Sequence, residues 1–222
     1  MNKSLNIPSD LIKAVNESFK NMRDSLKIIP EYLVELANLG WFISLDLTPR
    51  ETGEICLKIK ENNIQAIDNY MVDYVVHKID RVEKEVIKAF PKRIKPLEAG
   101  FRAYRKKEYY LSIPVLIAQI DGICKDSFEQ YFFTSNKNKK KKTRKKFSDL
   151  NYNEILNAFF TPTGEKINIS KNKDEFQDAK HKVYNRHEIM HGIDNDYGNK
   201  INCLKIISLL DYIVQITNPK KY

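Results

Sequence analysis

The chain has 222 residues, a formal net charge of +9 and three cysteines. This length allows a buried core in one or two domains, so a fold held together by disulfides is not required. The cysteines are widely spaced, the N-terminus lacks the apolar run of a signal peptide, and no segment reaches the roughly 18 apolar residues of a membrane span. We therefore expect a cytoplasmic protein with reduced thiols and no membrane partner.

Residues 1–92 are predicted to form a mostly helical N-terminal region. Apolar residues recur at helical spacing in residues 11–22 and 32–39. The short apolar run 41–47 is compatible with a strand or a buried loop. A further helix is expected to begin near Thr52, and a long one to cover residues 62–90. This region could hold a sensor or a partner-binding surface.

Pro91 and Pro96 mark the clearest internal boundary, so we divide the chain into residues 1–92 and 93–222. Helices are predicted at 97–107 and from about Ser112 to 133. The second is apolar nearly all round, which is typical of the central helix of a bundle.

Two residues of this predicted central helix carry specific expectations. Pro114 fits the first helical turn, where a missing N–H costs little. Asp121 requires a cation or a hydrogen-bond donor, because an unpaired carboxylate in an apolar helix is costly.

A basic tract follows between residues 137 and 146. It holds eight cations and no anion, which leaves 9 − 8 = +1 for the rest of the chain. Such a run repels itself and offers contacts to a polyanion, so it is either a solvated loop or an RNA-binding segment. The candidate RNA-binding residues are Lys137, Lys139, Lys140, Lys141, Lys142, Arg144, Lys145 and Lys146.

Three helices are expected after the tract, at about 147–160, 174–191 and 200–216. The second would end at Gly192, a typical C-terminal helix stop. Its last turns concentrate Arg186, His187, Glu188 and His191, and two different chemistries share this stretch.

The first is zinc proteolysis. His187 and His191 form an H-E-x-x-H pattern, in which two histidines one turn apart bind zinc and Glu188 acts as general base. No histidine or glutamate follows His191 to supply a third ligand, so this is the remote alternative.

The second is metal-free RNA cleavage by the R-x4-H pattern from Arg186 to His191. A base deprotonates the 2′-hydroxyl, a cation stabilises the phosphorane, and an acid protonates the leaving oxygen. Five helical positions separate the two side chains by about 140°, which favours a site shared between two subunits. A purely structural alternative is that Arg186 and His191 pair with Asp121 or Glu188 inside the bundle.

The stretch N-R-H-E-I-M-H-G-I-D-N-D-Y-G, with the amphipathic helix after it and the upstream Q-I-D-G-I helix, resembles the HEPN (higher eukaryotes and prokaryotes nucleotide-binding) superfamily. The resemblance covers roughly residues 96–216. It implies an all-α fold, an antiparallel helical bundle in residues 93–222, beside the additional N-terminal region.

The resemblance also implies a homodimeric, metal-independent endoribonuclease of a toxin, abortive-infection or antiviral defence system, with RNA and an antitoxin or defence-system component as partners. The candidate catalytic residues are Arg186, His191, His187 and Asp121, supported by Asn185 and Glu188, and no metal or other cofactor is expected. Some members of the superfamily bind RNA without cutting it, and this remains the main alternative.

Overall fold

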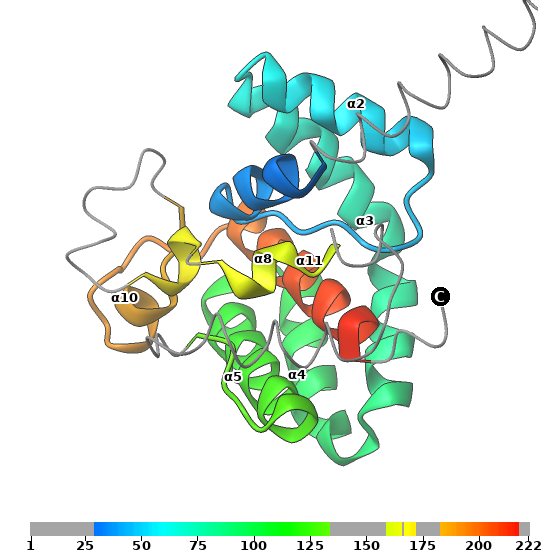
Figure 1. Ribbon diagram of the computed structural model, residues 1–222. Helices are drawn as coiled ribbons and strands as arrows, with labels where there is room; N and C mark the ends of the chain where they lie inside the picture. Colours follow the sequence, from blue (N-terminus) through cyan, green and yellow to red (C-terminus); the bar gives the residue numbers. More distant parts are fainter. Residues whose placement is uncertain (1–28, 134–158, 166, 172–182, 218–222) are drawn as a thin grey trace, which may run out of the picture.

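The computed structural model describes residues 29–133, 159–165, 167–171 and 183–217, and all regular elements within these ranges are helical (Figure 1). The prediction of an all-α protein is confirmed. Residues 29–38 are helical and precede the following elements: α2 (Pro49–Lys60), α3 (Ile64–Ala89), η1 (Pro91–Arg93), α4 (Ile94–Arg105), α5 (Tyr109–Phe128), α8 (Thr161–Gly164), η2 (Asn168–Ser170), α10 (Arg186–Met190) and α11 (Lys200–Thr217).

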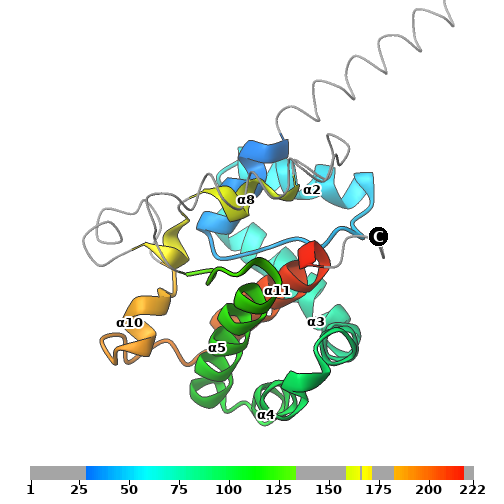
Figure 2. The ribbon, with the colours of Figure 1, turned by 60° about the horizontal axis from the view of Figure 1, so that its bottom comes forward.

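Helix α11 is the central element of the fold. All of its side chains from Cys203 to Ile216 are buried, and α3 and α5 pack directly on it. Figure 2 shows α3, α4 and α5 along one side of α11, and α8 with the 29–38 helix on the other. Helix α5, which was predicted to be central, packs on both α4 and α11 and buries mainly one face, so α11 is the more completely buried of the two.

The two buried charged residues of α11 each have a partner on α3. Lys205 Nζ lies 3.4 Å from Asp68, and Asp211 lies 2.9 Å from Arg81. Burial lowers the pKa of Lys205 and raises the pKa of Asp211, in each case against the attraction of the partner. Buried charges are tolerated when they are paired in this way.

Residues 41–47 form a loop rather than a strand, and residues 41–44 of it are buried. The backbone N–H of Phe42 donates to Ser208 Oγ at 3.2 Å, and that of Leu45 donates to Gln215 Oε1 at 2.5 Å. Since side chains of α11 satisfy these donors, the loop does not need a neighbouring strand.

The long helix predicted for residues 62–90 is confirmed as α3. Asn63 caps it by accepting a hydrogen bond from Ala66 N, and its buried side chains follow the expected spacing from Ile67 to Val86. The predicted junction at residues 92 and 93 falls at η1, and buried residues from both sides of it belong to one hydrophobic cluster. The division of the chain into two separate regions, residues 1–92 and 93–222, stays a prediction.

Helix α5 begins at Tyr109 and ends at Phe128, so it starts earlier and stops sooner than predicted. Pro114 therefore lies inside the helix, where it cannot donate to the carbonyl of Tyr110, four residues earlier. The hydroxyl of Tyr197 donates to that carbonyl instead, at 3.2 Å. The proline is accommodated because a side chain from the loop before α11 supplies the missing donor.

Across the described residues, no helix has both the length and the apolar character needed to span a bilayer.

Candidate functional site

Arg186 begins the short helix α10 and His191 caps it, and the helix predicted over 174–191 was wrong at residues 183–185. Residues 183–185 are not helical, and 172–182 lie outside the described residues. Asn185 explains the late start, because its backbone is extended and its Oδ1 accepts from the N–H groups of His187, at 2.9 Å, and Glu188, at 3.3 Å. A side chain in this role ends the extended segment and starts the helix.

The predicted stop at Gly192 is confirmed. Gly192 has φ +69°, a conformation that glycine adopts without a side-chain clash. Its N–H donates to the carbonyl of Ile189, and that of Ile193 donates to the carbonyl of Glu188 at 2.8 Å. These two bonds form a Schellman motif, so both ends of α10 are fixed by local hydrogen bonds.

Arg186 and Asp121, which are 65 positions apart in the sequence, lie together in the structure. Arg186 Nη2 is 3.6 Å from Asp121 Oδ2. The other carboxylate oxygen of Asp121 accepts from the backbone N–H of Phe133 at 3.1 Å. Asp121 was predicted to need a cation or a hydrogen-bond donor, and it has both: Arg186 of α10 and the backbone N–H of Phe133, which follows α5.

The guanidinium of Arg186 is not saturated by this contact. Its Nε is buried and has no hydrogen-bond partner. A distance of 3.6 Å is longer than a charge-assisted hydrogen bond, which is about 2.7–2.9 Å. The contact with Asp121 therefore leaves part of the hydrogen-bonding capacity of Arg186 unused.

His187 and His191 lie beside each other, with ring centroids 4.4 Å apart. His187 is half-buried, whereas His191 is exposed. Arg186 is the first residue of α10 and His191 its C-terminal cap, so the arginine and the exposed histidine are at opposite ends of the helix. Glu188 contributes its backbone carbonyl to the helix cap.

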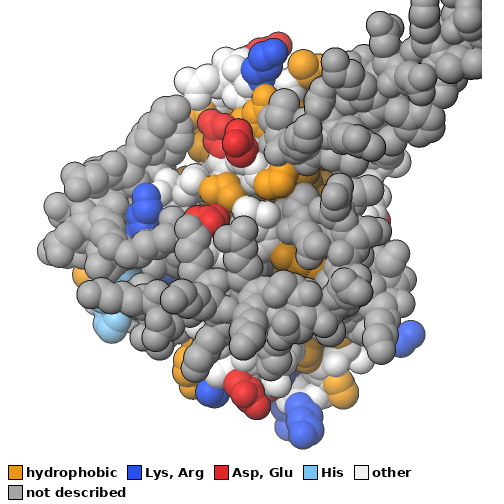
Figure 3. Space-filling model, viewed as in Figure 1, with side chains coloured by type: hydrophobic (Ala, Val, Ile, Leu, Met, Phe, Trp, Pro, Cys, Tyr) orange, Lys and Arg blue, Asp and Glu red, His pale blue; other side chains and the backbone are white. Residues whose placement is uncertain are grey.

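The surface around His191 is partly apolar. Met190 and Ile193, on either side of it in the sequence, are 42% and 48% exposed. Histidine side chains reach the surface at the left edge of Figure 3, on the side where Figure 1 places α10.

No group of three His, Cys, Asp or Glu within the described ranges is arranged to hold a metal ion. His187 and His191 would be two ligands of the zinc alternative, and a third is not placed beside them among these residues. The basic tract, residues 137–146, lies outside the described residues, so its predicted role in RNA binding stays a prediction.

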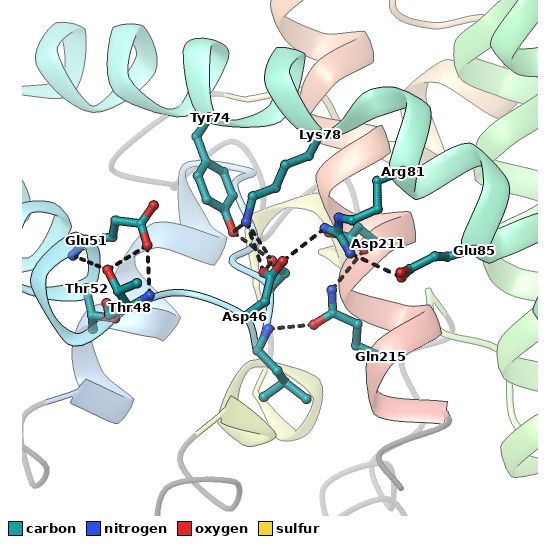
Figure 4. A network of polar contacts seen from close by, with 12 residues as sticks. Asp46, Thr48, Glu51, Thr52, Tyr74, Lys78, Arg81, Glu85, Asp211 and Gln215 are labelled. Atoms are coloured by element: carbon teal, nitrogen blue, oxygen red, sulfur yellow. Dashed lines mark hydrogen bonds and ion pairs between the residues drawn. The ribbon is translucent and has the colours of Figure 1, made fainter. Parts of the chain in front are cut away.

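A second group of polar side chains surrounds Arg81, where loop 41–48, α3 and α11 meet (Figure 4). Arg81 lies 2.9 Å from Asp211, 3.1 Å from Glu85 and 3.5 Å from Asp46. The other members of this Arg81 network are Ser44, Tyr74, Lys78 and Gln215.

The members of the Arg81 network bind mainly one another. Lys78 donates to Asp46 at 3.0 Å and to Tyr74 at 2.8 Å. Burial by itself would raise the pKa of Asp46, but hydrogen bonds from Ser44 and Lys78 and the charge of Arg81 outweigh it and lower that pKa. The network joins the N-terminal region to α11, and we assign it a structural role.

Sequence reasoning missed how α10 is anchored. Asn185 was expected only to support the site, yet its pattern with Glu188 three residues later is a recognisable helix start. Its amide Nδ2 also donates to the carbonyls of Asn168 and Lys171, contacts for which the sequence carries no local signal.

Comparison with known proteins does not place the chain in a family. No family model matches it, and neither does any curated protein or solved structure. The function of the chain therefore has to be inferred from the residues themselves.

Proposed function

We propose that the chain is a metal-independent endoribonuclease of the HEPN type, acting in a toxin or anti-phage defence system, whose site combines Arg186, Asp121 and the two histidines of α10. The observation that carries the proposal is Arg186 near Asp121 at 3.6 Å, at the start of a short helix that carries His187 and is capped by His191, whose rings lie beside each other. An arginine and histidines are sufficient for RNA cleavage without a metal.

The reaction assigns a separate task to each group. A histidine takes the proton of the 2′-hydroxyl, and the 2′-oxygen attacks phosphorus. The P–O5′ bond breaks, the leaving oxygen receives a proton from the other histidine in its protonated form, and the products carry a 2′,3′-cyclic phosphate and a 5′-hydroxyl. Arg186 stabilises the negative charge of the phosphorane, and Asp121 holds Arg186 in place.

A complete site would need a second copy of the chain. Arg186 points toward α5 and Asp121, while His191 is exposed at the other end of α10. The exposed apolar side chains of Met190 and Ile193 beside His191 suit a protein interface. In a twofold dimer, Arg186 of one copy would then work with His191 of the other.

The second candidate function is RNA binding without cleavage, which the eight cations of residues 137–146 favour independently of α10. It predicts RNA affinity that falls steeply with salt, and no product.

The test is incubation of the purified chain with mixed RNA in excess chelator, with analysis of product ends. The wild type should release 2′,3′-cyclic phosphate ends, and His191→Ala should be slower by at least about 100-fold. The matched control is His77→Ala, since His77 is also an exposed helical histidine but lies on α3. Absence of cleavage by the wild type, or equal cleavage by His191→Ala, contradicts the proposal.

A further inference from the structure

Three asparagines connect the N-terminal helix to α10. Asn38, the last helical residue of 29–38, accepts a hydrogen bond from Asn168 N at 3.1 Å through its side chain. Its backbone carbonyl accepts from Asn168 Nδ2 at 3.0 Å. The carbonyl of Asn168 in turn accepts from Asn185 Nδ2 at 3.2 Å.

Both ends of the Asn185 amide are therefore used, and they act on different segments. Its nitrogen holds η2 through the carbonyls of Asn168 and Lys171, and its oxygen caps the first turn of α10. A displacement of η2 is transmitted to the turn that begins with Arg186, because one rigid amide group makes both sets of bonds.

Burial makes these contacts hard to replace with water. Asn168 and Asn185 are only 3% and 1% exposed. When one partner of such a hydrogen bond is removed, water cannot take its place beside the remaining partner. The hydrogen bonds of the connected groups are weakened as well.

A second contact reaches the same junction. Tyr184, directly before Asn185, is 2% exposed and packs near Gly40, where an added Cβ would lie 3.2 Å from the tyrosine ring. Gly40 follows Asn38 by two residues. The segment entering α10 is thus held to the end of the 29–38 helix by both packing and hydrogen bonds.

We propose that Asn38 is a positioning residue for the α10 site, acting through Asn168 and Asn185, so that the 29–38 helix forms part of the scaffold that places Arg186. A change in the position of this helix alters the geometry of a site located 148 residues further along the chain. The effect expected on RNA cleavage rests on the proposed function, but the effect on α10 does not.

The direct test compares Asn38→Ala with Asn38→Asp by amide hydrogen exchange measured with NMR. Alanine removes the oxygen that accepts from Asn168 N, whereas aspartate retains it. We expect Asn38→Ala to accelerate exchange of the His187 and Glu188 amides roughly five-fold, the factor expected for loss of one buried hydrogen bond. Asn38→Asp should exchange like the wild type.

The α3 amides of Val75 and Val82 serve as the internal reference. The inference is overturned if α10 exchange does not change, if exchange rises equally in α3 and α10, or if Asn38→Asp behaves like Asn38→Ala. Each of these results excludes a specific connection through the Asn38 oxygen.

RNA cleavage supplies an independent second measurement. If the wild type cleaves, Asn38→Ala should lower kcat with little change in KM, and Asn38→Asp should restore it, because Arg186 is misplaced rather than removed. A wild type that does not cleave contradicts the proposed function and leaves the exchange result to decide the positioning role. Cleavage with wild-type kcat in Asn38→Ala contradicts the positioning role alone.

Discussion

The Arg81 network and the α10 site are built from similar residues but use them differently. The side chains of Arg81 and Arg186 are 29% and 32% exposed, so solvent access does not distinguish them. Arg81 has three carboxylates within 3.5 Å, whereas Arg186 has Asp121 at 3.6 Å. Both guanidinium groups have a buried Nε without a hydrogen-bond partner, so the useful distinction is the number and the distance of the carboxylates around each arginine.

This difference assigns the two arginines opposite roles. The partners of Arg81 connect three segments of the fold, and Asp211 among them is buried with a raised pKa. Arg186 has one distant carboxylate and is followed on α10 by His187 and, at the end of the helix, by the exposed His191. We therefore expect loss of Arg81 to reduce stability, and loss of Arg186 to reduce activity.

The largest expected effects come from substituting each arginine by alanine. Arg81→Ala leaves Asp211 buried without its cation and should lower the free energy of unfolding by roughly 2–4 kcal/mol. Arg186→Ala should change it by less than about 1 kcal/mol, because the contact with Asp121 is long and partly exposed. Urea unfolding of both variants measures the difference.

RNA cleavage should distinguish the same two variants in the opposite order, with the larger loss of activity in Arg186→Ala. Arg186→Ala is expected to lower kcat/KM by about 100-fold or more, through lost stabilisation of the phosphorane. Arg186→Lys tests whether charge alone is enough, since lysine lacks the planar guanidinium. Equal loss of stability in Arg81→Ala and Arg186→Ala would remove the distinction between the two regions.

The pH dependence of stability should differ in sign between two carboxylates of the Arg81 network. Burial by itself would raise the pKa of Asp46, but hydrogen bonds and cations outweigh it and lower this pKa below its ordinary 3.8. Asp46 therefore contributes stability that is present above pH 3.8 and lost as the pH falls through its folded-state pKa. Burial raises the pKa of Asp211 above 3.8, so its ionisation weakens folding as the pH rises from that value.

Substitution by asparagine isolates these two contributions. From pH 7 down to pH 3, the stability deficit of Asp46→Asn relative to the wild type should shrink. For Asp211→Asn, stability relative to the wild type should instead fall over the same range. Unfolding measured across this range checks both, and a shift in the same direction for the two variants would contradict the assigned pKa directions.

A smaller effect is expected at the end of α10. The Cβ of Gly192→Ala would meet no atom within 4 Å, so the substitution introduces only the strain of φ +69°. The expected loss of stability is about 1 kcal/mol. Thermal unfolding measures it, with Gly53→Ala as control, because Gly53 is helical, has open space around it and needs no positive φ. A loss equal to that of the control would contradict the role of Gly192.

The smallest effect concerns the donor that compensates for Pro114. Tyr197→Phe removes the hydroxyl that donates to the carbonyl of Tyr110, a partly exposed bond, so about 0.5 kcal/mol should be lost. In the double variant with Pro114→Ala, the helix regains its own donor and Tyr197→Phe should cost nothing further. A double-mutant cycle in urea measures this coupling, and additive effects would contradict it.

The elements that could be predicted from the sequence are those whose signals are local. The apolar spacing of α3, its cap at Asn63 and the stop at Gly192 lie within a few residues of the structure they determine. The central position of α11 could not be predicted in this way. Lys205 and Asp211 suggest a solvated face until their partners Asp68 and Arg81, more than 100 residues away, are known.

The candidate site shows the same limit. Arg186, His187, His191 and Asp121 could be selected from the sequence, and the structure places Arg186 3.6 Å from Asp121, a contact that the purely structural alternative also predicts. The catalytic roles of these residues stay a prediction. The predicted helix was continued through residues 183–185, which are not helical, because the capping role of Asn185 directly before Arg186 was not recognised. The contacts of Asn38 and Asn168 depend on tertiary structure and could not be predicted.

The most direct test of the central claim is complementation between Arg186→Ala and His191→Ala chains in the chelator assay. Random pairing of the two variants gives half of the dimers one chain of each kind. If Arg186 of one copy works with His191 of the other, each of these mixed dimers retains one intact site. An equimolar mixture, co-refolded to exchange subunits, should then regain about a quarter of wild-type cleavage, while each variant alone stays inactive. No recovery in a mixture shown to contain mixed dimers would contradict a site shared between two copies.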